Sequence, residues 1–488
     1  MTRDAIPEEK VKEAKFFSSL PPPWPEKGLL KRIQDKIKAS GRKVVVLDDD
    51  PTGTQTVHNV LVVTEWSEET LEYALARKEA VFYILTNSRS YPAEEAVEMN
   101  QEIARNLAKV AKRLGRDFDV VSRSDSTLRG HYPHEVQALR QTLENCLGET
   151  FNGEIIAPFF FEGGRSTAYD IHWVKEGDSL IPAAQTEYAQ DPVFGYRHSN
   201  LRKWLEEKTN GRVKADAVVS ITLDDVRTKG PSAVADILRG VRRGESIIVN
   251  AVTYGDMEVF VLGLLDAEEA GQRFIFRTAA SFVKVRGGIE SRGLLTASGL
   301  FPRGAPTDVG GLIIVGSYVQ KTTEQLKMAC QLDNLASIEL NARALLNSQM
   351  RRKEIAGVSG EAEKALLGGY DVIIFTSRRL VTGKSEKENM EIARQVSDAL
   401  VQATRKIKAR PKFVVAKGGI TSSDIGTKAL DVTKAVVLGQ ILPGVPVWLL
   451  GEESRFPGIP FVVFPGNVGD RDALAQVISI LRKTRNVE

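Results

Sequence analysis

Cysteine is scarce in this sequence, with only two among 488 residues. Cys146 and Cys330 lie far apart, inside helical patterns, and no CxxC or Cys/His spacing surrounds them. Such a pair excludes a disulfide-stapled fold and gives no sign of a zinc site. We therefore expect each cysteine to be buried as a small apolar side chain.

Long apolar runs and blocks of one charge are missing as well. No stretch of 18 or more apolar residues is present, and the N-terminal sequence MTRDAIPEEKVKEAKFF is charged, unlike the apolar core of a signal peptide. The 66 basic and 63 acidic residues nearly cancel to a formal charge of +3. Nothing therefore indicates nucleic acid or a membrane as a partner, and we expect a cytoplasmic protein.

The composition is that of an ordinary globular protein, with 42% hydrophobic and 26% charged residues. Because 488 residues exceed what one hydrophobic core usually serves, two domains are expected. Residues 1–40 combine a charged helical pattern with PPPWPE, which interrupts a helix, and are predicted to form an N-terminal arm. The Gly- and Pro-rich stretch Arg286–Gly311 marks a boundary, which gives predicted domains of residues 41–290 and 305–488.

Strands and helices alternate in both predicted domains. Short apolar runs bounded by polar or Gly-rich turns predict buried strands. They are KVVVLD, VLVVT, AVFYILTN, FDVVS, EIIAPF, AVVSIT and SIIVNAV, then GLIIVGS, DVIIFTS, KFVVAKGG, VPVWLL and PFVVFPGN. Helical periodicity separates many of them, at residues 93–114, 131–147, 322–332, 385–409 and 470–483. This alternation predicts an α/β fold: two α/β domains with largely parallel sheets and a ligand cleft between them.

Three consecutive acids follow the first of these strands, in KVVVLDDDPTGTQ. Asp48, Asp49 and Asp50 repel one another unless cations, donors or raised pKa values relieve them. α/β folds bind ligands at the ends of their strands, and Gly53 lets the backbone bend close to a ligand. The alternative is that one aspartate caps the next turn while the others are solvated.

Two further connections after predicted strands are rich in polar side chains. The first, VSRSDSTLRGHYPHE, contains Arg123, Asp125, Ser126, Thr127, Arg129 and His131. The second, APFFFEGGRSTAYD, contains Gly163, Gly164, Arg165, Ser166 and Thr167. Paired guanidiniums with neighbouring hydroxyls suit a carboxylate or a polyol, so the three loops predict one polar pocket. Alternatively, Ser126 or Thr127 caps the next helix and Arg129 pairs with Asp125 on the surface.

A glycine pair marks a second candidate site, in the C-terminal half. Gly418 and Gly419 follow the strand KFVVAK and precede a helix expected to start near Thr421. Bare backbone amides at a helix N-terminus suit phosphate oxygens. Alternatively, the same glycine pair forms only a tight turn, and Ser422 or Ser423 caps the helix that follows. No Walker A pattern is present, so a P-loop enzyme is excluded.

Seven segments of the sequence, taken together and in this order, resemble the four-carbon acid sugar kinase family. They are LDDDPTGTQ, SDSTLRG, APFFFEGGRST and TEYAQDPVFG, followed by IIVGSYVQKTTEQL, AKGGITSSDIGTKAL and FPGNVGD. The resemblance extends from about Lys43 over nearly all of the remaining chain, and SDSTLRG is its most specific segment. It implies a two-domain kinase that uses ATP to phosphorylate the terminal hydroxyl of a small sugar acid such as threonate, erythronate or a 3-oxo-tetronate.

The resemblance also implies roles for individual residues, with the sugar acid bound by the N-terminal domain and the nucleotide by the C-terminal one. The residues expected to face the substrate are Asp48, Asp49, Thr52, Gly53, Arg123, Asp125, Ser126, Arg129 and Arg165. The residues expected to face ATP are Gly316, Ser317, Gly418, Gly419, Thr421, Gly466 and Gly469.

The acids and arginines of the predicted substrate site divide the chemistry between them. We predict that Asp49, or else Asp48, accepts the proton of the attacking hydroxyl. Only one of these two neighbours readily faces the substrate, because adjacent residues of an extended chain point to opposite sides. The other acids would hold Mg²⁺ through water, and Arg129 and Arg165 would clamp the carboxylate of the sugar acid.

Several positions depart from the usual pattern of the family. Ile420 follows the glycine pair where an acid is common, Val319 replaces a hydroxyl, and Arg123 replaces a lysine, while DDDPTGTQ has an additional acid and a proline. Asp424, one helical turn later, is a candidate substitute for the missing acid. These departures keep open a second hypothesis, a protein that binds a sugar acid and a nucleotide without turnover. A dinucleotide-dependent dehydrogenase is a third, but no GxGxxG follows the first strand.

Overall fold

The computed structural model describes residues 8–301, 308–378, 381 and 386–483. Parts of the predicted arm and of the predicted second domain, at residues 1–7, 305–307 and 484–488, lie outside the described residues, as does Ser385, the first residue of a predicted helix.

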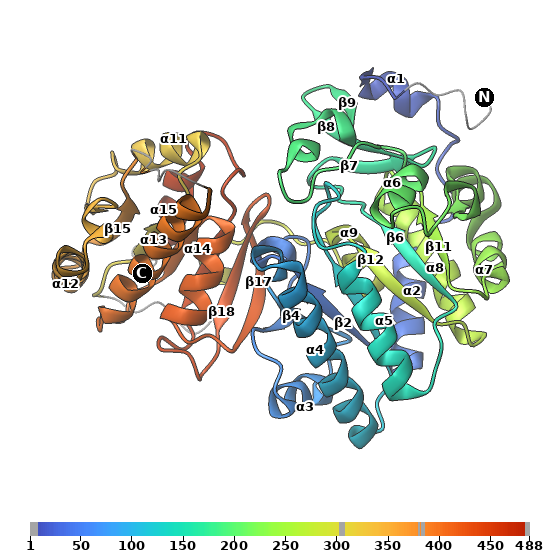
Figure 1. Ribbon diagram of the computed structural model, residues 1–488, viewed down its shortest axis with the longest axis horizontal. Coiled ribbons are helices and arrows are strands. Elements are labelled where there is room, and N and C mark those ends of the chain that lie inside the picture. Colours follow the sequence, from blue (N-terminus) through green and yellow to red (C-terminus); the bar gives the residue numbers. More distant parts are fainter. Residues whose placement is uncertain (1–7, 302–307, 379–380, 382–385, 484–488) are drawn as a thin grey trace. The chain divides into compact units, whose positions relative to one another are not determined.

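The chain folds into two compact units and crosses between them three times. One unit contains the chain up to Thr56 together with Glu65–Ser291, and the other contains Val57–Thr64 together with the chain from Arg292 onward. Figure 1 allows the chain to be followed by colour from blue to red. The sequence predicted a single boundary and missed the exchange of Val57–Thr64, because nothing in the apolar run VLVV tells which sheet the strand joins.

The first unit is built on a parallel sheet in the order β10-β11-β6-β12-β5-β2-β4. Its strands are β2 (Lys43–Asp48), β4 (Val81–Leu85), β5 (Phe118–Arg123), β6 (Gly153–Ala157), β10 (Val219–Ile221), β11 (Glu245–Val249) and β12 (Phe274–Thr278). Most of these strands are almost wholly buried, as their continuous apolar runs predicted. All run in the same direction, so the loops that follow them gather at one edge of the sheet.

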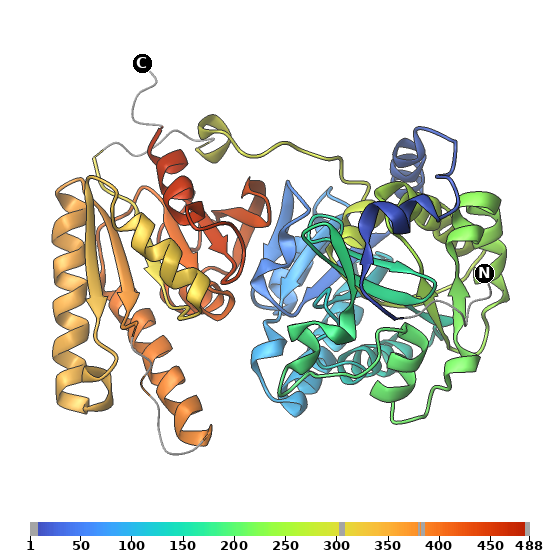
Figure 2. The ribbon, with the colours of Figure 1, turned by 90° about the horizontal axis from the view of Figure 1, so that it is seen from above.

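Helices cover both faces of this sheet (Figures 1 and 2). α4 packs against α3 and α5 on one face, and α8 packs against α2, α7 and α9 on the other. The helices are α2 (Leu29–Ser40), α3 (Glu68–Ala76), α4 (Ala93–Leu114), α5 (His134–Leu147), α6 (Leu201–Lys208), α7 (Gly230–Gly240), α8 (Tyr254–Glu269) and α9 (Ala280–Arg286). The ends of α4 show why such segments stop where they do. Two acids occupy its first turn, two basic residues its last, and Gly115 ends it in the left-handed conformation.

A small antiparallel sheet lies in the first unit in addition to the large one. Its order is β1-β9-β8-β7, with β1 (Val11–Lys12), β7 (Arg165–Ala168), β8 (Ile171–Glu176) and β9 (Ser179–Pro182), and α1 (Glu13–Ser18) follows β1. The described part of the predicted arm is thus paired with the first domain rather than separate from it. α2 buries Leu29, Ile33 and Ile37 in the same unit.

The second unit has a mixed sheet in the order β3-β17-β18-β19-β16-β13-β15-β14. The strands from β19 to β14 are parallel, whereas β3, β17 and β18 pair antiparallel. They are β3 (Val60–Val63), β13 (Leu312–Val315), β14 (Leu335–Leu340), β15 (Asp371–Thr376), β16 (Val414–Lys417), β17 (Lys434–Leu442), β18 (Val445–Leu450) and β19 (Pro460–Phe464). The predicted α/β class with largely parallel sheets is confirmed.

The helices of the second unit again form two layers. α15 packs against α10 and α11, and α13 packs against α12 and α14. They are α10 (Ala297–Leu300), α11 (Gln320–Ala329), α12 (Ser348–Leu367), α13 (Glu386–Lys406), α14 (Gly419–Asp424) and α15 (Ala473–Arg482). Among all the described residues of the chain, no helix is long and apolar enough to cross a membrane.

Several local predictions were wrong in detail. Both cysteines are exposed and unpaired, Cys146 near the end of α5 and Cys330 at the end of α11, because each falls on the outward side of its helix. Residues 131–133 precede α5 instead of belonging to it, since Pro133 limits its start. The strands β12, β14 and β17 were not predicted, because charged or polar residues interrupt their apolar runs.

Candidate functional site

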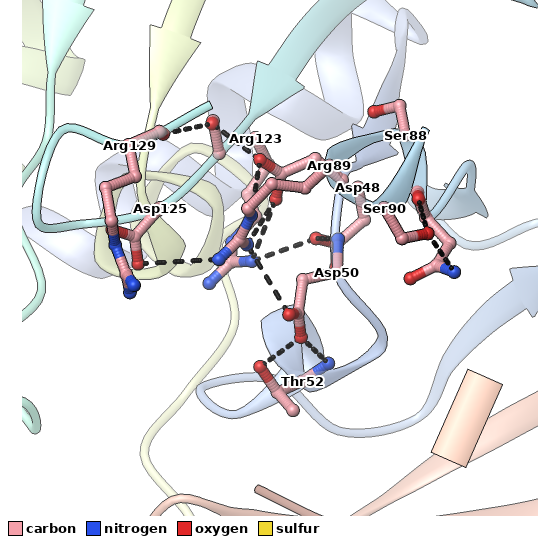
Figure 3. Close-up of polar contacts among 12 residues, drawn as sticks. Asp48, Asp50, Thr52, Ser88, Arg89, Ser90, Arg123, Asp125 and Arg129 are labelled. Carbon is pink, nitrogen blue, oxygen red and sulfur yellow. Dashed lines mark hydrogen bonds and ion pairs between the residues drawn. The ribbon is translucent and has the colours of Figure 1, made fainter. Parts of the chain in front are cut away.

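Asp48 is the last residue of β2 and is almost fully buried, with 1% of its surface exposed. Arg123, its partner in register at the end of β5, donates from Nη1 to Asp48 Oδ1 at 2.9 Å (Figure 3). The other oxygen, Oδ2, has no hydrogen-bond partner among the described residues and lies where a Cβ on Gly53 would project, 2.0 Å from that position. Burial, opposed by Arg123, raises the pKa of Asp48 to about 7. Asp48 can therefore take up a proton near neutral pH.

Arg89 lies in a short turn after β4 and contacts both acids that follow Asp48. Its Nε and Nη2 donate to the two oxygens of Asp49 at 3.1 and 2.7 Å, and Ser124 Oγ donates to Asp49 Oδ2 at 2.7 Å. Asp50 instead caps the turn Pro51–Thr54, accepting from the Thr52 amide at 2.8 Å. The third acid thus behaves as the capping alternative predicted. Asp49, in contrast, is buried and paired rather than solvated.

The second predicted connection joins the same cluster through Asp125. Asp125 accepts from Arg129 Nε at 2.9 Å and lies 3.8 Å from Arg89 Nη1 (Figure 3). Burial alone would raise the pKa of Asp125, but Arg89 and then Arg129 outweigh it and hold the pKa below its usual range. The carboxylate of Asp125 therefore stays charged, and it fixes both guanidiniums.

A tyrosine ring brings the two predicted clamp arginines together. The guanidinium of Arg129 lies 5.1 Å from the centroid of the Tyr188 ring, and that of Arg165 lies 5.6 Å from it. Arg165 Nη2 also donates to the Tyr188 hydroxyl at 3.3 Å. Within the described residues Arg165 forms no ion pair with a carboxylate, unlike Arg129, so its positive charge is available to an anionic ligand.

Other predicted substrate residues are more enclosed than the sequence suggested. Arg123 is buried with Asp48, and Ser126 is buried with its carbonyl accepting from His172. Thr127 bonds to Asp125. Neither Ser126 nor Thr127 caps α5, whose N-cap is Pro133 and has no side-chain cap. The half-buried members of the cluster are therefore Asp50, Thr52, Arg89, Asp125, Arg129 and Arg165.

The sequence reading missed four residues of this cluster: Arg89, Tyr188, His172 and Arg277. Arg89 could have been found, because it lies in TNSRSYP, a polar connection directly after a predicted strand. Arg277 interrupts the run FIFRT and is 1% exposed, and its Nη2 donates to the carbonyls of Asp125 and Arg129 at 3.0 and 3.2 Å. It therefore shapes the loop from beneath, a role that no local pattern reveals.

His172 makes the stability of the first unit depend on pH. It is fully buried between the Ser126 carbonyl and the Thr167 hydroxyl, and burial lowers its pKa to about 4. Because the folded pKa lies below the unfolded value, the contribution of His172 to stability is present above pH 6.5 and is lost as the pH falls towards 4, by about 3 kcal/mol at most. In urea unfolding at pH 8 and pH 5, His172→Gln should therefore lose less stability on acidification than the wild type. The exposed His134→Gln variant should match the wild type, and equal pH dependence in all three proteins would refute the assignment.

The second unit contains a cavity of about 560 Å³ at the carboxyl ends of β13, β15 and β16. One side is lined by small residues, which are Gly316, Ser317, Gly418, Gly419, Thr421 and Gly466. The loops pack closely: a Cβ on Gly316 would lie 2.2 Å from Thr421 Oγ1, and a Cβ on Gly466 would lie 3.3 Å from Ser317 Oγ. Further lining comes from α13, through the apolar side chains of Ile392, Ala393, Val396 and Leu400 and the polar ones of Asn389 and Ser397.

Lys417 ties the glycine-lined loops together from below. It is buried at the end of β16, and its Nζ donates to the carbonyls of Pro465 and Gly466 at 2.5 and 3.1 Å. Burial, assisted by Lys321, lowers its pKa to about 7. The amide of Gly418 also serves structure, because it donates to the Phe464 carbonyl at 2.8 Å. Of the predicted glycine pair, the amide of Gly418 is therefore committed within the fold.

Two of the positions that depart from the family pattern lie at this cavity. Val319 and Ile420 both line it, and they are 44% and 60% exposed. Asp424 does not line it. It accepts from Ser397 Oγ at 2.6 Å and pairs with Lys428 at 2.7 Å, which leaves it engaged elsewhere. Gly469 is likewise outside the lining, at a positive φ of 83° next to Ala473.

These two α/β units, one with an acidic, arginine-bound cluster and one with a glycine-lined cavity, define a two-domain protein with separate sites for small polar ligands. Residues 44–286 match the family model of a sugar-binding N-terminal domain. Residues 312–474 match that of a nucleotide-binding C-terminal domain. The chain belongs to the four-carbon acid sugar kinase family.

Individual relatives are distant in sequence. The chain is 24% identical over 473 residues to the D-erythronate kinase of Heliobacterium modesticaldum. The aligned region covers 90% of this chain and 97% of the relative. Two solved structures share the fold. Haemophilus influenzae protein HI1011 has a TM-score of 0.60 at 18% identity, covering 90% of this chain and all of that one. A protein described as a putative tRNA synthase of Salmonella typhimurium LT2 has a TM-score of 0.63 at 16% identity, covering 89% and 98%.

Proposed function

We propose that this protein is an ATP-dependent kinase that phosphorylates the terminal hydroxyl of a four-carbon sugar acid. The observation that carries the proposal is the cavity of the nucleotide-binding unit. Its glycine-lined side leaves room for phosphates, and its apolar wall from α13 suits a nucleobase. The match to a sugar-binding domain and the similarity to a D-erythronate kinase support a sugar acid as the acceptor.

Phosphoryl transfer asks a protein mainly to position two reactants and to stabilise charge. In the proposed reaction the hydroxyl oxygen bonds to the γ-phosphorus, the bond from that phosphorus to the β–γ bridging oxygen breaks, and ADP leaves. The hydroxyl proton passes to Asp49 or to Asp48. Arg129 and Arg165, which share the Tyr188 ring, hold the carboxylate of the sugar acid and so decide which hydroxyl is presented. The cleft predicted between the domains stays a prediction.

Mg²⁺ is the cofactor that we propose to accompany ATP. In the described part of the chain no group of three or more His, Cys, Asp or Glu residues could hold a metal ion by itself. Mg²⁺ usually takes most of its ligands from phosphates and water and only one or two from carboxylates, so a complete protein cage is not needed. Asp48, Asp49 and Asp50 would supply the carboxylate, and the ion would neutralise phosphate charge.

A second candidate function is binding without turnover. It is favoured by Val319 and Ile420, two exposed apolar side chains in the lining of the proposed nucleotide cavity, where the resemblance to the family implies polar groups. Neither side chain can bind a phosphate or a metal ion. On this hypothesis the protein would still recognise a sugar acid and a nucleotide.

Release of ADP separates the two functions. The protein would be incubated with ATP, Mg²⁺ and a panel of four- to six-carbon sugar acids, and we expect turnover that requires one or a few four-carbon acids. The Ile420→Glu variant, which restores the acid common in the family, should keep or raise that turnover. Thermal stabilisation by an acid without any turnover would favour binding alone. No stabilisation and no turnover with any acid would refute both functions.

A further inference from the structure

A recess of about 270 Å³ lies in the first unit at the amino ends of β2 and β4, remote from the acidic cluster. Four of the residues that line it are cationic: Lys38, Arg42, Lys43 and Lys78. The other lining residues are neutral, and no carboxylate belongs to the lining. Neither the family pattern nor the proposed reaction uses any of these side chains. The recess is therefore an unexplained concentration of positive charge.

The cations of the recess differ in what holds them. Lys43 is buried, and its Nζ donates to the carbonyls of Arg77 and Glu79 at 2.5 and 2.6 Å. Arg42 is paired with Asp119 at 2.7 Å. Lys38 and Lys78 are exposed, and within the described residues neither forms a hydrogen bond or an ion pair through its side chain. Two uncommitted ammonium groups therefore border a recess with a third ammonium group in its wall.

Within the described residues, Lys38, Lys43 and Lys78 form no ion pair with a carboxylate, whereas Arg42 does. Burial lowers the pKa of Lys43, and the nearby charges of Arg116 and Arg77 act in the same direction, against Glu79. The carbonyls beyond the end of α3 explain the position of Lys43. They do not explain Lys38, Lys78 or the open volume between them. A multivalent anion would complete the arrangement, since lysines bind phosphates as point charges.

We propose that this recess is a second ligand site, which binds a small polyphosphate anion through Lys38, Lys43 and Lys78. The site is separate from the substrate cluster, because β2 begins at Lys43 and ends at Asp48, which places the two about 17 Å apart along the strand. An anion bound there would contact the start of β2, the strand whose end carries the acidic loop. The proposal does not depend on the protein being a kinase.

Calorimetric titration of the full chain with sodium pyrophosphate at low ionic strength tests the site. No nucleotide would be added, because ATP is itself a polyphosphate anion and would compete for the recess. We expect saturable binding of one pyrophosphate, weakened about tenfold or more in the double variant Lys38→Glu/Lys78→Glu. The control is Lys112→Glu/Lys203→Glu, which changes the net charge equally at exposed lysines outside the recess. It should bind like the wild type.

The remaining outcomes decide against the site. Equal weakening in both double variants would mean that pyrophosphate responds only to net charge. Equal binding in all three proteins would place the anion elsewhere, and an absence of saturable heat in the wild type would mean that the recess binds no polyphosphate. Both pairs of substitutions are at exposed side chains, so the variants should fold, and circular dichroism spectra would verify this before titration.

Discussion

Replacing Asp49 by asparagine should lower kcat by about two to four orders of magnitude while ATP still binds. The substitution keeps the volume of the side chain but removes a charged proton acceptor. It also weakens the pair with Arg89, whose Nε and Nη2 both donate to Asp49. The half-buried side chain of Arg89 would therefore be held less firmly. Single-turnover kinetics with saturating sugar acid, together with calorimetric binding of ATP, would measure the two effects separately.

A matched control exists in the same unit. Asp256 forms a more deeply buried pair with Arg227, at 2.7 and 2.9 Å, but lies outside the acidic cluster. Asp256→Asn should therefore lower the stability of the protein, because it weakens a buried ion pair and an N-cap, yet leave kcat of the folded enzyme nearly unchanged. A similar loss of kcat in both variants would mean that Asp49 acts only through stability. Full activity of Asp49→Asn would exclude it as the base.

Asp48 is the alternative base, and the pH dependence of the rate tells the two apart. Because the pKa of Asp48 is raised to about 7, a reaction that needs its ionised form should slow as the pH falls through that value. Asp48→Asn would then abolish turnover at every pH. A rate that stays level from pH 8 to pH 6 would exclude Asp48 as the base.

Gly418→Ala should weaken ATP binding by about tenfold to a hundredfold, with the KM for the sugar acid unchanged. Gly418 has a φ of 121°, a conformation in which any side chain is strained. A Cβ there would also lie 3.1 Å from Thr421 Oγ1 and 3.2 Å from Ser317 Cβ, so the loop would have to open where the phosphates are proposed to bind. Calorimetric titration with ATP measures the change.

The control for this variant is Gly360→Ala. Gly360 lies in α12, and a Cβ there would meet no atom within 4 Å. Its replacement should leave ATP binding unchanged and stabilise the helix slightly, because alanine has the higher helix propensity. If Gly418→Ala bound ATP as tightly as Gly360→Ala, the glycine-lined loops would not be the phosphate site.

Sequence patterns predicted the fold well wherever apolar runs were continuous. β2, β4 and β5 are such runs, and the polar residues that follow them could be placed at one edge because parallel strands share a direction. β12 was missed since Arg277 sits in its middle, and a buried charge inside a strand can be recognised only from its partners. The pairing of Arg89 with Asp49 was missed for the same reason, since it joins two loops that follow different strands.

The cavity of the second unit shows where sequence patterns stop being informative. Of the seven residues that the sequence analysis expected to face ATP, six line this cavity and Gly469 does not. The apolar wall could not be predicted, because the residues of α13 that form it are spaced like those of any helix that packs on a sheet. Only the three-dimensional arrangement distinguishes a wall that covers the core from one that lines a cavity.

The exchange of β3 between the units has a consequence for how the chain is made. β3 completes the edge of the second sheet against β17, and Thr64 bonds to a carbonyl 368 positions away. During synthesis on the ribosome this apolar strand must therefore wait for β17 until nearly the whole polypeptide has emerged. Such a distant pairing slows folding, and until it forms the apolar segment is prone to aggregate. Newly made chains should therefore depend on chaperones more than the size of either unit suggests.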